Sequence, residues 1–281
     1  MFALTRFEIK KMVALRRSWV GFLTIVLING LFALGFYLQN RRHGNTQVHG
    51  MRERLVNEFI NAFAYTQVIL SPCMFLLFPM ILGIIGSHLL AGEMEVGSLR
   101  MVLCRSVSRW EVVAAKFVAL CGYSGVMLVA LLTVSYGVSA CLFKPMGDVI
   151  IFGQGMFLLP KGIIVLPQDQ ALTRIYLSYL LAWPMLASVS AMALMFSLLT
   201  RHVSAAAILT TAVYFCSYIV CGIPLLSAIH PFMPTRYLPF FRYALMPEIP
   251  WNTIGLHAVW TAGFTVAFLG IAVGTFNLQD L

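Results

Sequence analysis

The chain has 281 residues, of which 60% are hydrophobic and only 10% are charged, and its mean hydropathy is +0.88. Soluble globular chains carry about 25% charged residues, so this composition excludes an ordinary water-soluble fold and indicates a membrane protein. The net charge of +9 is spread over both predicted sides of the membrane. It therefore favours attraction to anionic membrane lipid and gives no reason to expect nucleic acid as a partner.

Six uncharged runs predict six transmembrane helices in a single all-α, polytopic membrane domain, residues 1–281. All 19 basic and 10 acidic residues lie outside these runs, as expected where burial of an ionised side chain in lipid is costly. Each run is long enough for the roughly 20 residues that cross a bilayer as a helix, and none alternates as a transmembrane strand does. The runs are 18–38, 64–90, 117–143, 175–199, 203–229 and 254–276.

Residues 1–17 are basic and predict a cytoplasmic N-terminus in the cell inner (plasma) membrane; with six spans, the C-terminus is cytoplasmic too. At 100° per residue the segment forms an imperfect amphipathic helix at the membrane interface, because Glu8 and Lys11 interrupt its apolar face. A disordered basic tail is the alternative. The first span exceeds the 7–15 residues of a signal core, which favours a retained anchor over a cleaved signal. The basic residues are Arg6, Lys10, Lys11, Arg16 and Arg17.

The sequence lacks the common motifs of nucleotide-binding and zinc-dependent enzymes. A phosphate-binding loop needs G-x-x-x-x-G-K-[ST], and residues 155–162 have Pro160 where the second glycine is needed and Gly162 where the hydroxyl is needed. The motif H-E-x-x-H is absent. The spans contain no paired carboxylates, which weakens the hypothesis of an ion-coupled carrier. We therefore predict that this chain is not an enzyme and binds no metal or cofactor of its own.

The histidines and cysteines favour structural roles. His88 with Glu93 and Glu95 straddles a membrane boundary without a second cluster, so a hydrogen-bonded interfacial histidine is a better interpretation than a metal ligand, and His257 is interpreted in the same way. Five of the six cysteines lie within the predicted spans, where cysteine behaves as a small apolar residue. Cys104 lies in the predicted cytoplasmic loop, so no disulfide framework is indicated.

The charged segment GEMEVGSLRMVLCRSVSRWEVVAAKFVA, residues 92–119, separates the second and third spans. Glycines punctuate its start, and an apolar i, i+3, i+4 face follows at Leu99, Val102 and Leu103, which predicts a short helix. Ser108 and Glu111 then form a capping box, so the next helix is expected to begin at about Arg109. An ordinary solvated loop is the alternative.

This segment resembles the cytoplasmic loop of type-2 ABC exporter permeases. Ser106 replaces the proline that is usual there, whereas the tail 275–281, the basic helix before the first span and the six-span layout are also similar. The positions that match the family's loop are Glu93, Gly97, Ser98, Leu99, Leu103, Val107, Ser108, Arg109 and Lys116.

The resemblance implies a permease that dimerises with a second copy or a paralogue and works with two separately encoded ABC ATP-binding subunits. ATP and Mg would be bound by those subunits, and residues 98–104 would be the coupling helix that docks on them. The expected coupling residues are Glu93, Glu95, Gly97, Ser98, Leu99, Arg100, Val102, Leu103, Arg105, Ser108 and Arg109.

Two outer connectors and one small-residue motif complete the sequence. Residues 144–174 are apolar but interrupted by Gly and Pro, and we expect a membrane-hugging loop or a small packed cap. Residues 230–253 are rich in Pro and aromatics; the resemblance implies re-entrant helices, acting as an outer gate or as interfacial anchors. Gly270 and Gly274 form a GxxxG motif that can pack within the chain or across a dimer.

The leading hypothesis is the membrane-spanning permease of an ABC exporter, and the alternative is a non-transporting scaffold or mechanical transmission subunit that works with an ABC ATPase. The substrate class stays open between lipid, peptide and drug, because the candidate path residues are neutral. A hydroxyl in a span more often bonds a neighbouring helix than a ligand. The candidates are Gln67, Ser71, Tyr123, Ser124, Tyr214 and Tyr218.

Overall fold

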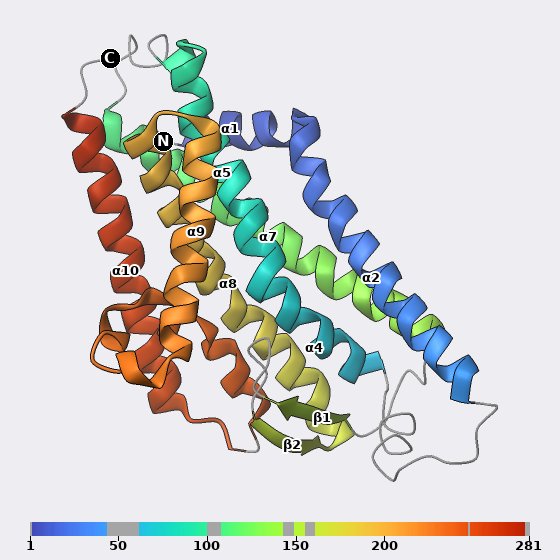
Figure 1. Ribbon diagram of the computed structural model, residues 1–281. Coiled ribbons are helices and arrows are strands. Elements are labelled where there is room, and N and C mark those ends of the chain that lie inside the picture. The colour runs from blue at the N-terminus through green and yellow to red at the C-terminus, as the bar shows by residue number, and fades with distance from the viewer. Residues whose placement is uncertain are drawn as a thin grey trace.

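The computed structural model describes residues 2–43, 62–99, 108–142, 149–154, 161–246 and 248–278. Within these residues six helical stretches are long and apolar enough to cross a membrane, which confirms the predicted helical membrane fold (Figure 1). They are α2 (Arg16–His43), α4 with η1 and α5 (Ala62–Pro72, Cys73–Leu77 and Phe78–Glu95), α7 (Arg109–Leu142), α8 (Gln168–Thr200), α9 (Val203–Gly222) and α10 (Trp251–Asn277).

The bundle has two different ends (Figure 1). A short helix, α1 (Phe2–Ala14), lies across one end, where α5, α8 and α10 finish and α7 and α9 begin. We call this the α1 end. The opposite end carries the strands β1 (Val149–Gln154) and β2 (Lys161–Leu166), and we call it the hairpin end.

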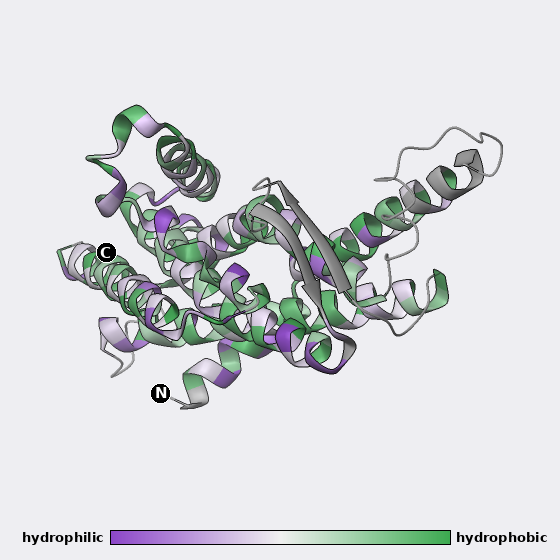
Figure 2. Cartoon of the chain, turned by 90° about the horizontal axis from the view of Figure 1, so that it is seen from below, coloured by the Kyte–Doolittle hydropathy of each residue, from purple (hydrophilic) through white to green (hydrophobic). Residues whose placement is uncertain are grey.

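Helix α8 is the centre of the bundle, because α5, α7, α9 and α10 all pack against it. Most residues of α5 and α8 are buried, whereas few residues of α2, α9 and α10 are. Viewed from the hairpin end, hydrophobic residues recur along the outer helices as well as the inner ones (Figure 2), and many large hydrophobic side chains of α2, α9 and α10 are exposed. Such surfaces are stable only against lipid or another subunit.

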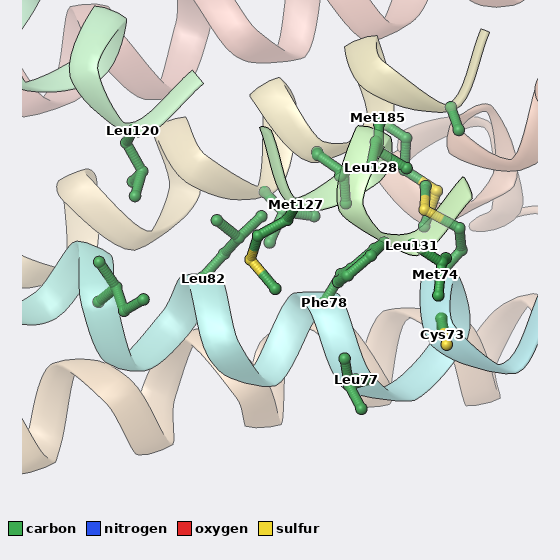
Figure 3. Packing of buried hydrophobic residues seen from close by; sticks show 14 of the residues in the cluster. Cys73, Met74, Leu77, Phe78, Leu82, Leu120, Met127, Leu128, Leu131 and Met185 are labelled. Carbon is green, nitrogen blue, oxygen red and sulfur yellow. The ribbon is translucent and has the colours of Figure 1, made fainter. Parts of the chain in front are cut away.

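The second span is continuous but changes its winding. Pro72 and Pro79 lack the N–H groups that would bond one turn back, and the five residues between Pro72 and Phe78 form a π-helix. Around this irregular turn the span packs closely on α7 and α8, with interlocking apolar side chains (Figure 3). The labelled residues there are Cys73, Met74, Leu77, Phe78, Leu82, Leu120, Met127, Leu128, Leu131 and Met185.

The connector 144–174 contains a β-hairpin that the sequence analysis did not predict. Strands β1 and β2 pair antiparallel, with Val149 opposite Leu166 and Gln154 opposite Lys161. Both strands are short apolar runs rich in Val and Ile, residues that favour extended structure, and each is far too short to cross a bilayer. The apolar character of the connector therefore comes from a hairpin at the mouth of the bundle.

Helix α9 ends at Gly222, seven residues before the end of the uncharged run 203–229. Ile223 is extended because it precedes Pro224, and a residue before proline is disfavoured in helical conformation. Instead of re-entrant α-helices, the described part of this connector holds short 3₁₀ helices, as expected where prolines recur. They are η3 (Pro224–Leu226), η4 (His230–Phe232), η5 (Pro234–Arg236) and η6 (Leu238–Leu245).

Candidate functional site

Four charged side chains meet inside the α1 end, and we call them the ion cluster: Glu8, Lys11, Glu93 and Lys116. The Lys116 ammonium donates to Glu8 Oε1 at 3.0 Å and lies 2.8 Å from Glu93 Oε2. Lys11 donates to the other oxygen of Glu93. The cluster joins α1, the last turn of α5 and the third turn of α7, so it ties the N-terminal helix to both sides of the connection between α5 and α7.

Burial makes the ion cluster costly to disturb. The side chain of Lys116 is 1% exposed, that of Glu8 5% and that of Glu93 9%, whereas Lys11 reaches the surface. Two positive and two negative charges balance, so each ion is compensated. Removing one partner would leave an uncompensated buried charge, which costs about 3–5 kcal/mol. The cluster therefore fixes the position of α1 relative to α5 and α7.

The start of α7 positions Lys116. The Ser108 N–H donates to Glu111 Oε2 at 3.1 Å and the Ser108 hydroxyl donates to the same oxygen at 2.8 Å. Glu111 thus reaches back as the capping box predicts, and α7 begins at Arg109 as expected. The serine hydroxyl bonds the carboxylate, whereas in the standard capping box it accepts from the backbone. This capped start aims Lys116 at Glu8 and Glu93.

The end of α5 leads into the connection to α7, residues 96–108, which we call the coupling segment. Gly97 has a left-handed backbone (φ +72°), and its N–H donates to the Met94 carbonyl at 3.0 Å, so the chain turns there as a helix C-terminus with glycine does. Val96, beside it, is apolar yet 81% exposed. Ser98 is half-buried and its hydroxyl lies 3.4 Å from the Glu93 carbonyl.

One prediction about this segment is wrong. Leu99 was expected on a face that a partner would cover, but it is 1% exposed and belongs to the protein's own core. The i, i+3, i+4 pattern correctly identified an apolar face without showing which way it turns. The other predicted coupling residues in this stretch, Arg100, Val102, Leu103 and Arg105, lie outside the described residues.

Further contacts tie the coupling segment to the rest of the α1 end. Glu95 Oε1 accepts from the Val203 N–H at 2.9 Å and lies 3.4 Å from His202 Nδ1, so it caps the start of α9. Arg109 donates to the Phe276 carbonyl, and its guanidinium carbon lies 5.5 Å from the centre of the Phe276 ring. The two ends of the segment are thus held to α9 and to the last turn of α10.

His88 has a structural environment of the kind the sequence favoured. Its Nε2 lies 2.8 Å from an Arg17 guanidinium nitrogen, which joins α5 to the start of α2. In the part of the chain that the structure describes, no group of three or more His, Cys, Asp and Glu side chains is arranged to hold a metal ion.

The candidate path residues lie in three separate places. Gln67 and Ser71 are buried on α4, where the Gln67 amide oxygen accepts from the Ser178 hydroxyl at 2.9 Å. Tyr214 and Tyr218 lie on α9, where Tyr218 packs edge-on against Phe75.

The remaining two candidates, Tyr123 and Ser124, lie on α7. The Tyr123 hydroxyl donates to the Ser18 carbonyl on α2 at 2.8 Å, and the Ser124 hydroxyl to the Cys121 carbonyl at 2.8 Å. Tyr123 lines an apolar pocket between α1, α2 and α7, and the other five candidates are not among the residues that line it.

Sequence reasoning missed half of the ion cluster. Glu8 and Lys11 looked like interruptions of an apolar helix face, and their partners lie 108 and 82 positions away. The sequence does show that Glu8 and Lys11 have opposite charges and are three residues apart. They therefore lie on one side of α1, where they could pair with charges on other helices.

Comparison with protein families gives one assignment. A family model described as ABC-2 family transporter protein matches residues 2–245. The matched region includes α1, the ion cluster, the coupling segment and the 3₁₀ helices of the hairpin end. A comparison with curated protein sequences finds no match.

Proposed function

Because the chain belongs to the ABC-2 transporter family and is therefore a multi-pass membrane subunit, or permease, of an ABC transporter, we propose that it dimerises and exports a substrate. The second permease is another copy or a paralogue. Two separate ABC ATP-binding subunits bind ATP and Mg, and their hydrolysis cycle drives the movement. The α1 end faces the cytoplasm of the cell, with both chain termini on that side of the plasma membrane.

The ion cluster is the observation that supports coupling through this segment. Glu93 stands immediately before the turn at Gly97, and Lys116 stands where the chain has re-entered the bundle. Both are bound to α1, through Lys11 and Glu8. A displacement of residues 96–107 by the ATPase would therefore move α5, α7 and α1 together, because buried ion pairs resist separation.

We assign the surface that contacts the ATPase to the apolar residues of the coupling segment. Val96 is the exposed apolar residue beside the turn, and Val102 and Leu103 stay the predicted apolar contacts beyond it. Exposed apolar side chains of this kind contribute to binding when a partner covers them. Leu99 is excluded from this surface because the permease's own core buries it.

The experiment is co-purification of the permease with the ABC ATP-binding subunit that is proposed as its partner. Val96→Asp places a carboxylate at the contact and should remove most of the co-purified ATPase while leaving permease yield unchanged. Leu278→Asp is the matched control, since Leu278 is 87% exposed and lies at the same end outside the segment. Equal recovery of the ATPase with both variants would overturn the docking assignment.

Two further measurements separate the remaining parts of the proposal. A cysteine at Val96 should be protected from an impermeant maleimide in intact cells, and one at Asp169, exposed at the hairpin end, should react. The reverse pattern would contradict the orientation. Complexes in proteoliposomes that hydrolyse ATP under permease control without moving any tested lipid, peptide or drug would favour mechanical transmission over export.

A further inference from the structure

An apolar pocket of about 450 Å³ lies between α1, α2 and α7. Three helices that differ in direction form it: α1 crosses the end of the bundle, and α2 and α7 run away from it (Figure 1). Almost all of its surface is carbon. The lining residues are Ile9, Met12, Val13, Ser18, Trp19, Phe22, Ala119, Gly122, Tyr123 and Val126.

Two hydrogen bonds hold the walls of this pocket in place. The Trp19 indole N–H donates to the Val13 carbonyl at 3.1 Å, which fixes α2 against α1. The Tyr123 hydroxyl donates to the Ser18 carbonyl at 2.8 Å, which fixes α7 against α2. Trp19 is 61% exposed and stands where an interfacial tryptophan is expected, near the junction of a span with the helix that precedes it.

Basic residues stand at the rim of the pocket. Arg6, Ile9, Lys10 and Val13 follow at i, i+3, i+4 and i+7 along α1, so they share one side of that helix. Ile9 and Val13 line the pocket, and both basic residues are exposed. An apolar space open to the membrane thus has two cations beside it, at the level where α1 meets the span.

We infer that this pocket binds one acyl chain of an anionic phospholipid, taken from the leaflet beside α1, with the lipid phosphate next to Arg6 and Lys10. A flexible hydrocarbon chain fits walls made of aliphatic and aromatic carbon, and an anionic headgroup complements the basic stripe. The bound chain packs against Met12, the residue that follows Lys11 of the ion cluster. The lipid therefore braces the helix that the cluster holds from its other side.

The chain offers a matched pair of glycines for testing this site. Gly122 lines the pocket, and a Cβ placed on it would meet no described atom within 4 Å. Gly137 lies on the same helix, is equally open to a Cβ and is outside the pocket. Gly122→Phe adds a ring at the wall of the pocket with no clash at its Cβ, and Gly137→Phe adds the same ring elsewhere on α7.

The measurement is native mass spectrometry of the purified full-length permease with phosphatidylglycerol or phosphatidylcholine of identical acyl chains. Wild-type protein and Gly137→Phe should keep one phosphatidylglycerol at collision energies that strip phosphatidylcholine. Gly122→Phe should lose this retained lipid. Arg6→Gln and Lys10→Gln should each weaken the preference for phosphatidylglycerol about fivefold, whereas Arg201→Asn, at an exposed site on the same end, should leave it unchanged.

Several results would overturn the assignment. Retention of phosphatidylglycerol by Gly122→Phe would show that the lipid binds elsewhere. Equal retention of the two lipids by wild-type protein would show that the basic rim does not select the headgroup. Loss of a permease dimer in Gly122→Phe with lipid binding intact would show that the pocket receives a second copy of the chain.

Discussion

The two ends of the bundle are stabilised in different ways. At the α1 end, Lys116 lies between Glu8 and Glu93, and each partner comes from a different helix. At the hairpin end, the short helix η6 packs against α8 and α10 through buried aromatics such as Phe240 and Phe241. Ion pairs depend on one set of partners, whereas apolar packing depends mainly on the area that is covered.

This difference indicates where a directed input can enter the molecule. Displacing α1 separates Glu8 from Lys116 and Lys11 from Glu93, so the displacement is passed on to α7 and α5, which carry those partners. At the hairpin end, a side chain that shifts exchanges one apolar neighbour for another at little cost. The comparison predicts all-or-none effects of substitution at the α1 end and graded effects at the hairpin end.

The largest effect is expected for Lys116→Met. The substitution removes the cation between Glu8 and Glu93 and leaves Glu8 without a charged partner, which should destabilise the folded protein by about 3–5 kcal/mol. Thermal unfolding in detergent, followed by tryptophan fluorescence, measures the loss. The double variant Glu8→Leu with Lys116→Met should recover most of it, because the unpaired charge is gone. A stable single variant would contradict the account of the cluster.

Gly97→Ala should have a smaller effect at the same end. A left-handed backbone costs an L-residue about 1–2 kcal/mol, and the strain falls on the turn that begins the coupling segment. We expect a reduced permease-dependent ATPase rate, measured in proteoliposomes that also contain the proposed ABC ATP-binding partner. Gly97→Asn is the control, since asparagine tolerates this conformation better. Equal rates for both variants and the wild type would mean that the turn plays no part in coupling.

Phe240→Leu tests the graded behaviour of the hairpin end. The ring is 1% exposed, and the swap keeps an apolar side chain of smaller volume, so the expected loss is about 1 kcal/mol. The matched control is Phe232→Leu, in which a ring that is 75% exposed is replaced, and its melting should not change. A loss as large as that of Lys116→Met would remove the contrast between the two ends.

The smallest effect on the isolated chain is expected for Gly270→Leu with Gly274→Leu. A Cβ at either glycine would meet no described atom within 4 Å, so the GxxxG motif does not pack against the described part of its own chain. Monomer melting should stay unchanged, and any loss of permease self-association on size-exclusion chromatography would assign the motif to a dimer contact. Lowered monomer stability would contradict the structure.

Most of the helical architecture could be predicted from the sequence, because the membrane excludes charged residues from the spans and so marks where each span lies. The six spans, the start of α7 at Arg109 and the turn at Gly97 all follow from local signals. The hairpin of residues 149–166 and the early end of α9 at Gly222 were not predicted. A count of apolar residues is the same for a short strand as for part of a membrane helix. It also does not show that a helix ends at a proline before the apolar run is over.

The ion cluster and the burial of Leu99 show why the site was only partly predictable. A single sequence shows that Lys116 enters a span and that Glu8 interrupts an apolar face, but their pairing depends on how α1 lies across the bundle. Leu99 lies on an apolar helix face. Such a face can pack into the protein's own core or bind a partner, and only tertiary packing decides between the two.

The central claim is that force on the coupling segment reaches α1 through the ion cluster. Backbone hydrogen exchange of residues 2–14 tests it most directly, measured in the complex with the ABC ATPase without nucleotide and with ATP and Mg under conditions that block hydrolysis. In the wild type, ATP should change exchange in both the coupling segment and α1. In Glu8→Leu with Lys116→Met, the coupling segment should still respond and α1 should not. An unchanged α1 response in that double variant would contradict the account.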